Sequence, residues 1–198
     1  MQHEHRTGQI LCRSNQSIVR SSLSRLYLNK MIKELTNPLW DYSLKIYTNK
    51  DVKLLCITLQ DDYDINVNIV LWCCWYASEL GPFSHQFLNQ VLAYNAPWHN
   101  HVTRQLRQAR QWLRTNLNNE LIESFRQDII QLEITSEAFQ QNQLYELSIK
   151  QNKAVQNSKN AARANLQNYF NTLTTKISDH HWQLIETKLL TRVSFRTT

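Results

Sequence analysis

The chain has 198 residues, a formal net charge of +6 and 42% hydrophobic residues. This length suits a single domain, which can bury a sizeable core without disulfides or structural metals. Only two glycines and three prolines occur. Because β-sandwiches and barrels need many turns rich in these residues, the composition disfavours them and favours long helices.

The positive charge is concentrated at the N-terminus. Residues 1–30 contain five basic residues and one acidic residue, which leaves 17 basic and 15 acidic residues in 31–198. A polyanion-binding domain is therefore not implied. We interpret residues 1–30 as a basic tail that is disordered, is a transit-like segment, or lies upstream of a true start at Met31. Residues 31–198 are the expected helical domain, with 178–198 as a C-terminal helical extension.

The first expected helices lie between residues 38 and 59. Asn37 is a cap residue followed by proline, an arrangement typical of a first helical turn. An apolar stripe at helical spacing then runs from Trp40 to Tyr47. A second stripe predicts a helix over 51–59, and residues 60–64 are expected to form an acidic connection.

Residues 66–79 are apolar on nearly every side. A helix of this kind is normally buried at the centre of a bundle, and the run is too short to span a bilayer. Gly81 is expected to end it in a left-handed conformation. The sequence therefore predicts an all-α, single-domain bundle of about six helices around a buried apolar helix (66–79), with no membrane association.

A basic helix is expected after the next break in the chain. Ser84 can cap a helix that ends at residues 95–97, where Pro97 is expected to start another. Four arginines lie on one arc of that helix: Arg104, Arg107, Arg110 and Arg114.

The C-terminal half of the chain is expected to contain three more helices. A long one begins after residue 119, and its apolar spacing is interrupted at Ser136. Residues 140–160 are polar and are expected to loosen into a connection. Apolar stripes predict a helix over 162–177 and a last one that Asp179 caps.

Several short motifs lie between residues 35 and 173. They are Leu39-Trp40, Tyr47, Leu59-Gln60-Asp61, Asn66-Val67-Asn68 through Trp72-Cys73-Cys74-Trp75, Pro97-Trp98, and Ala164-Asn165-Leu166 with Tyr169. In this combination the chain resembles a small proteobacterial family of conserved hypothetical proteins, classified as a domain of unknown function. The resemblance implies a helical fold and a bacterial cytosolic setting, and it brings no activity, substrate or catalytic residues. The family has Asp where this chain has Asn66, so a carboxylate role is not carried over.

The cysteines are interpreted as core residues. Cys73 and Cys74 are adjacent in an apolar run, and there is no CxxC pair or zinc-like spacing with His. A nucleophilic thiol needs a nearby base, and an apolar helix raises the pKa of a thiol. We therefore assign no catalytic residue, metal or cofactor, favour a non-enzyme, and expect a reducing, cytoplasmic location.

The acidic string Asp61, Asp62 and Asp64 could hold a divalent cation, because clustered carboxylates suit hard ions. The string also partly matches the DDxxD motif of helical isoprenoid synthases. The required helical spacing and a second acidic motif are both missing. We interpret these residues as a surface connection that favours the N-terminus of the following helix.

The four arginines Arg104, Arg107, Arg110 and Arg114 are the best interaction candidates. Guanidinium groups on one arc could hold phosphates or an acidic protein surface. The alternative is a solvated face paired with Glu120, Glu123 or Asp128. The leading hypothesis is a non-enzymatic cytoplasmic adaptor that engages a protein partner through this face and the 120–150 helix.

Two other functions remain open. Asn68 is a polar residue on an apolar helix and needs a hydrogen-bond partner. Together with Trp72 and Trp75 it could line an interior pocket of a small enzyme or ligand-binding domain. The third hypothesis is nonspecific nucleic-acid association through the basic tail, which no recognisable motif supports.

Overall fold

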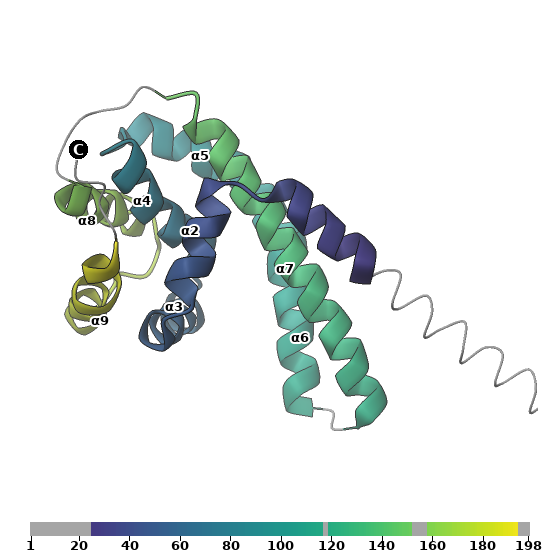
Figure 1. The fold of residues 1–198 in the computed structure, drawn as a ribbon. Helices are drawn as coiled ribbons and strands as arrows, with labels where there is room; N and C mark the ends of the chain where they lie inside the picture. The colour runs from purple at the N-terminus through teal and green to yellow at the C-terminus, as the bar shows by residue number, and fades with distance from the viewer. Residues whose placement is uncertain (1–24, 117–118, 152–157, 194–198) are drawn as a thin grey trace, which may run out of the picture.

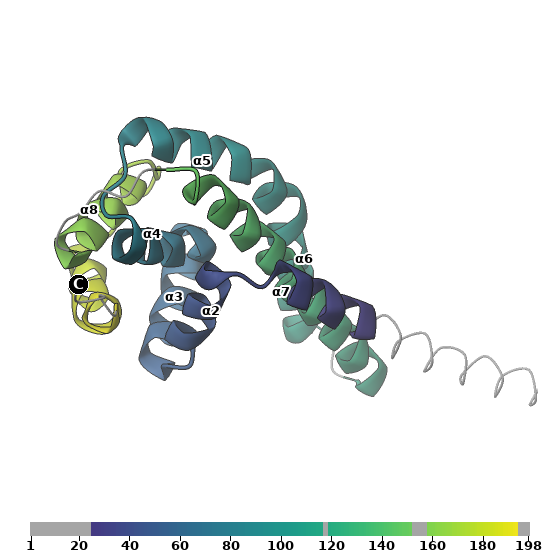
Figure 2. The ribbon, with the colours of Figure 1, turned by 45° about the horizontal axis from the view of Figure 1, so that its top comes forward.

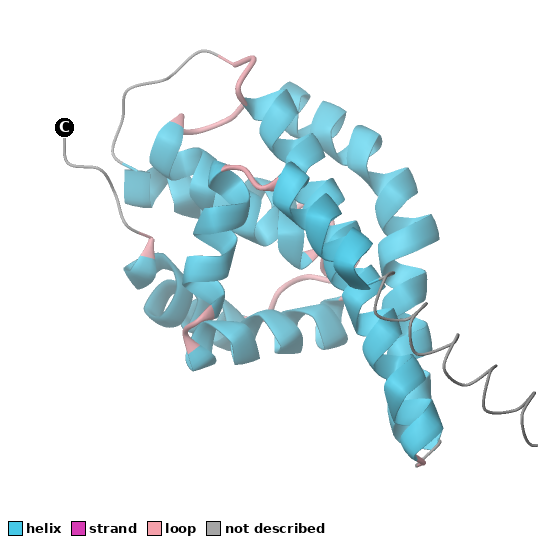
Figure 3. Cartoon of the chain, turned by 45° about the vertical axis from the view of Figure 1, so that its right-hand side comes forward, coloured by secondary structure: helices cyan, strands magenta, loops and turns pink. Residues whose placement is uncertain are grey.

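The computed structural model describes residues 25–116, 119–151 and 158–193 (Figure 1). Within these ranges the ordered segments are helices, and no strand is present (Figure 3). The predicted all-α fold is confirmed. The first 24 residues of the predicted tail and the last five of the predicted extension lie outside the described ranges. None of the described helices is both long and apolar enough to cross a membrane.

A helix over residues 25–35 comes before the labelled elements. The labelled elements, in chain order, are α2 (Pro38–Tyr47), α3 (Lys50–Tyr63), α4 (Val67–Glu79), α5 (His85–Trp98), the π-helix η1 (His99–Thr103), α6 (Arg104–Asn116), α7 (Glu120–Ser148), α8 (Ser158–Phe170), α9 (Asp179–Leu184), the π-helix η2 (Ile185–Leu189) and the 3₁₀-helix η3 (Leu190–Arg192).

Asparagine side chains fix the starts of the first helices. The Asn37 side chain accepts hydrogen bonds from the first backbone N–H groups of α2, as predicted, and Asn49 does the same for α3. The prediction of an acidic connection at 60–64 is wrong, because α3 continues to Tyr63. Only Asp64 leaves the helix, with a left-handed φ of 53°. The Tyr63 hydroxyl bonds to a histidine of the C-terminal region, which ties down the extra turn.

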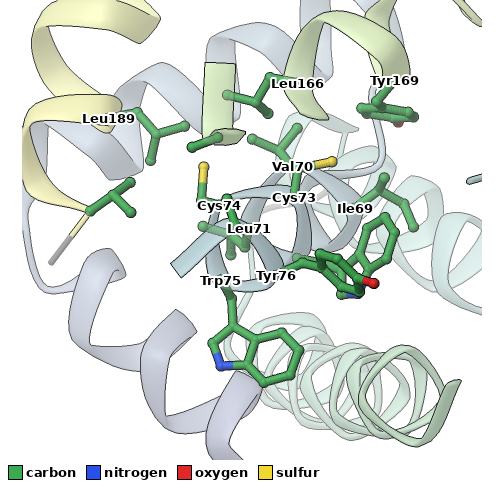
Figure 4. Close-up of a cluster of buried hydrophobic side chains, with 14 of the residues drawn as sticks. Ile69, Val70, Leu71, Cys73, Cys74, Trp75, Tyr76, Leu166, Tyr169 and Leu189 are labelled. Carbon is green, nitrogen blue, oxygen red and sulfur yellow. The ribbon is translucent and has the colours of Figure 1, made fainter. Parts of the chain in front are cut away.

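Helix α4 is the centre of the fold, as the sequence predicts. Every residue from Val67 to Ala77 is buried, and α4 packs chiefly against α8, with α2, α3 and α7 on its other sides. Figure 4 shows the Cys74 thiol directed toward α8, while Trp75 lies on the opposite side of α4. Gly81 follows with a φ of 95°, which confirms the predicted left-handed turn.

Helices α5, η1 and α6 form one continuous helical path (Figure 2). The predicted break at residues 95–97 is wrong, because Pro97 lies inside α5. Proline lacks an N–H group but has a φ that fits a helix, so a chain can pass through it with a local distortion. Here the path widens directly afterwards into the π-helical turn η1.

Helix α7 is also longer than the sequence predicts. Residues 140–148 are helical rather than a loose connection, because Gln140, Gln141, Leu144 and Ser148 are buried in the body. Helix α8 ends at Phe170 instead of continuing to 177. The cap of α9 is Ser178, one residue before the predicted Asp179.

Two helices project from the body of the molecule as a hairpin (Figure 1). They are α6 and the first half of α7, and the helix over 25–35 lies beside α7. The Arg25 guanidinium pairs with Asp128 at 2.8 Å, and the Gln131 side chain reaches Asn29 at 3.4 Å. We call α6, residues 120–132 of α7 and residues 25–35 the arm, and the rest of the described chain the body.

Candidate functional site

The four predicted surface arginines of α6 have different environments. Arg107 is buried at the base of the arm. Its Nε donates to Glu133 Oε1 at 3.0 Å, and its terminal guanidinium nitrogen donates to Glu137 Oε1 at 2.8 Å. Arg107 is therefore an internal structural residue and offers little surface to a partner.

Arg110 completes this buried cluster from one turn further along α6. Its Nε donates to Glu133 Oε2 at 2.5 Å, and a second guanidinium nitrogen reaches Glu133 Oε1 at 3.2 Å. Glu133 is itself buried, so one carboxylate holds two guanidinium groups. Paired charges of this kind fix one arrangement of their helices, because separating them would leave a charge without compensation.

Glu137 lies at the edge of the same cluster. Its partial burial raises the pKa of the carboxyl to about 7, although the Arg107 guanidinium opposes the shift and the Glu133 carboxylate adds to it. This carboxyl therefore titrates near neutral pH, unlike an ordinary surface glutamate.

Arg104 and Arg114 remain accessible. Arg104 pairs with Asp64 at 2.5 Å across the junction between α3 and α6, and Arg114 is exposed near the tip of the arm. The ion pairs expected with Glu123 and Asp128 are not formed by these arginines. Glu123 pairs with Arg126, and Asp128 pairs with Arg25. The predicted arc thus divides into the buried Arg107, the half-buried Arg110, and the more accessible Arg104 and Arg114.

Exposed apolar side chains gather on the arm. Leu121 is 84% exposed and Phe125 is 56% exposed on α7, and Trp112 is exposed on α6. Leu121, Phe125 and Leu132 share one stripe of α7 because they are spaced by four and seven residues. Asp128 lies on the same stripe and pairs with the helix over 25–35, which carries further exposed apolar residues: Leu26, Tyr27 and Met31.

The interior of the body contains a chain of buried side-chain amides. The Asn68 amide donates to Gln140 Oε1 at 2.7 Å and accepts from Gln141 Nε2 at 2.8 Å. The Gln140 amide donates in turn to Asn95 Oδ1 at 2.7 Å, and the Asn66 amide reaches the same oxygen at 3.3 Å. Asn68 therefore has the hydrogen-bond partners that its position requires.

Sequence reasoning identified Asn68 in this chain but missed Asn95 and Gln140. A signal was available on α7, where Glu133, Ser136 and Gln140 occupy the stripe that also carries buried apolar residues. Ser136, read as an interruption, accepts hydrogen bonds from the Trp98 indole and contacts the Thr103 hydroxyl at 2.7 Å. Polar residues on a buried stripe indicate a polar contact with a neighbouring helix.

The two tryptophans proposed to line a pocket with Asn68 are packed in the core. Trp72 is fully buried, donates to Ser148 Oγ at 2.8 Å and stacks on Phe83 with ring centroids 4.9 Å apart. Trp75 packs against Tyr145. Their role as pocket residues stays a prediction, and the observed geometry is that of packed aromatic rings.

The cysteines of α3 and α4 are free and buried. Burial raises the pKa of Cys56 to about 12, and it also raises the pKa values of Cys73 and Cys74 well above the ordinary value. The end of α3 separates Asp64 from Asp61 and Asp62, which lie within the helix. Asp64 pairs with Arg104, and Asp62 faces His181. Among the described residues, no three His, Cys, Asp or Glu side chains gather as metal ligands would.

Comparison with known proteins identifies the family of this chain. No curated protein and no solved structure matches the chain significantly. A family model described as "Protein of unknown function (DUF2390)" matches residues 38–144. The matched range covers more than half of the chain and includes α4, all the residues of the amide chain from Asn66 to Gln141, and both helices of the hairpin. The chain therefore belongs to the DUF2390 family of proteins of unknown function.

Proposed function

We propose that this protein is a non-enzymatic, cytoplasmic bacterial binding module that engages a partner protein through the arm. One observation carries the proposal. Of the 12 large hydrophobic residues that are exposed in the described ranges, seven lie on the arm. Exposed apolar patches that gather on one part of a protein mark interaction sites more often than single exposed residues do.

The form of the arm suits an apolar helix of the partner. The stripe of Leu121, Phe125 and Leu132 lies beside the helix over 25–35, so two roughly parallel helices present apolar side chains together. An amphipathic helix binds such a surface by placing residues spaced by three and four into it. Arg114 and Lys33 are exposed on the arm and would favour acidic residues at the rim of the partner.

The buried cluster at the base of the arm supports the same function. Arg107 and Arg110 of α6 are held on Glu133 of α7, so the two helices of the hairpin are fixed to each other before a partner arrives. A surface that is ordered in advance binds with a smaller entropic cost.

The proposal is tested by the double substitution Leu121→Asp and Phe125→Asp. Both side chains are exposed, so we expect the fold to persist while the apolar stripe acquires two charges. Affinity capture from the native host should lose a specific partner with this variant, and isothermal titration with the purified partner should show at least a tenfold weaker affinity.

Leu54→Asp is the matched control. Leu54 is 66% exposed on α3 in the body, so this variant adds a charge at a similar site away from the arm. It should capture the partner as the wild type does. Equal capture by all variants, or loss that follows Leu54→Asp as strongly as the arm variant, contradicts the proposal. Arg107→Glu is unsuitable as a test because Arg107 is buried between two carboxylates.

A further inference from the structure

A small cavity lies in the body where four elements meet. It is bounded by Asn66 at the start of α4, Asn95 of α5, His99 of η1, which continues α5, Tyr169 of α8, and Asp64 at the end of α3. Its volume is about 150 Å³. Pockets for drug-sized ligands are typically several times larger, so this one suits a compact molecule or group.

The Asn95 amide is the central feature of the cavity. Asn95 is 2% exposed, and its Oδ1 accepts hydrogen bonds from both Gln140 and Asn66. These two bonds fix the orientation of the amide, because Oδ1 is the atom that both donors require. Its Nδ2 group is buried and has no hydrogen-bond partner among the described residues. A buried donor without an acceptor is unfavourable, and such groups normally find one.

Other groups at the cavity also offer hydrogens. The Tyr169 hydroxyl accepts the backbone N–H of Asn66 at 3.1 Å, a bond that leaves its own hydrogen free to be donated. His99 Nδ1 is likewise buried without a partner among the described residues, and it donates a hydrogen only in the tautomer that is protonated there. The N-terminus of α4 and the Arg104 guanidinium add positive potential. Asp64 is the one carboxylate in the wall, and it is already paired with Arg104.

We propose that this cavity binds a small carboxylate, whose oxygens accept hydrogen bonds from Asn95 Nδ2 and the Tyr169 hydroxyl. An ionised carboxylate has only acceptor atoms, so these donor groups complement it. The volume of the cavity accommodates an acetate-sized molecule. The cavity lies away from the exposed apolar residues of the arm, so its test does not depend on the proposed partner binding.

His99 provides an internal reporter of the bound charge. The pKa of His99 is lowered to about 4, chiefly by burial and also by the nearby Arg107 and Arg104 guanidinium groups, while Asp64 opposes the shift. A bound carboxylate adds a negative charge beside the imidazole. The titration midpoint of His99 therefore moves upward when the site is occupied.

The experiment is a titration of the full chain with sodium acetate, followed by NMR of the Asn95 side-chain amide and the His99 imidazole. Sodium chloride keeps the ionic strength constant, and acetamide serves as a neutral probe of the same shape. We expect acetate to produce saturable shifts at both residues and to raise the titration midpoint of His99. Acetamide should produce neither effect. Equal shifts with acetamide, or none with acetate, overturn the assignment of a carboxylate.

Asn95→Asp tests the role of the donor. The new carboxylate can still accept from Gln140 and Asn66, but it replaces the unpartnered N–H group with an oxygen. We expect at least a tenfold loss of acetate affinity. Asn119→Asp, which adds the same charge at the cap of α7, far along the chain from the cavity residues, should bind acetate as the wild type does.

Tyr169→Phe provides a second variant if Asn95→Asp fails to fold. It removes only the hydroxyl, and we expect several-fold weaker acetate binding. Unchanged acetate affinity in either folded variant contradicts the proposed contacts.

Discussion

The body and the arm use the same types of residue in opposite ways. In the body, Trp72 is fully buried, and its indole N–H has a hydrogen-bond partner. In the arm, Trp112 is 57% exposed, and Leu121 extends almost fully into solvent. Conversely, charged residues are buried at the base of the arm, where Glu133 holds two arginines. The body thus buries most of its large apolar side chains in one core, whereas the arm leaves many of its apolar side chains exposed to solvent.

Replacing one tryptophan in each region should give the clearest test of this difference between body and arm. Trp72→Ala removes a buried aromatic ring and should lower the free energy of unfolding by about 3–5 kcal/mol. Trp112→Ala removes an exposed ring and should change it by less than about 0.5 kcal/mol. Urea denaturation followed by circular dichroism measures both. Similar losses would mean that Trp112 is also a packing residue.

The next largest effect is expected at the base of the arm. Glu133→Gln leaves Arg107 and Arg110 without their shared carboxylate, and breaking a buried ion pair in this way should cost about 3 kcal/mol. The control is Glu123→Gln, which removes the exposed pair with Arg126 and should leave the denaturation midpoint unchanged. A loss in the control equal to that of Glu133→Gln would contradict the distinction.

A smaller, pH-dependent effect is expected from Glu137. Its folded-state pKa of about 7 lies above the ordinary 4.5, so the folded state binds more protons between these values. This carboxyl therefore reduces stability as pH rises through that window. His99, with its pKa lowered from 6.5 to about 4, acts with the opposite sign.

Glu137 and His99 have opposite effects on how stability changes with pH, so a variant is needed to isolate the effect of Glu137. Glu137→Gln removes the contribution that falls with pH, so its stability relative to the wild type should be greater at pH 8 than at pH 5. Urea denaturation at the two pH values tests this. A constant difference between variant and wild type would show that Glu137 titrates as an ordinary surface residue.

The smallest signal is expected from the thiols of the body. In a Cys12→Ser background, Cys56, Cys73 and Cys74 should not react with Ellman's reagent in the folded protein, because all three are buried with raised pKa values. They should react fully in urea. A cysteine introduced on the arm by Ser124→Cys, at an exposed site, should react at once. Rapid labelling of a native body cysteine would indicate that α4 is accessible.

The helices with strong local signals could be predicted from the sequence. Asn37 with its following proline marked the start of α2, and the continuous apolar run marked α4 as the centre. The helix ends were harder to predict, because burial decided them. Gln140 looks like a connection residue, yet it lies in a helix whose amides are paired with Asn68 and Asn95.

The candidate sites were predictable only in part. The arginine spacing on α6 was visible, but sequence spacing cannot show that Glu133 lies opposite Arg107, since the two residues are 26 positions apart. The cavity at Asn95 is lined by three stretches that are distant in sequence: residues 64–69, 92–100 and Tyr169. Pro97 also misled the prediction, because it hid the continuity of the helix that carries both Asn95 and the arginines.

That continuity has a mechanical consequence. Neither helix of the hairpin has a loop where it leaves the body: α5 passes through η1 into α6, and α7 is a single helix of 29 residues. From Glu120 to Glu133 the hairpin extends roughly 20 Å at 1.5 Å per residue. It therefore works as a rigid spacer rather than a flexible tether. A partner bound at the tip would be held at a fixed distance from the body and in a fixed orientation relative to it.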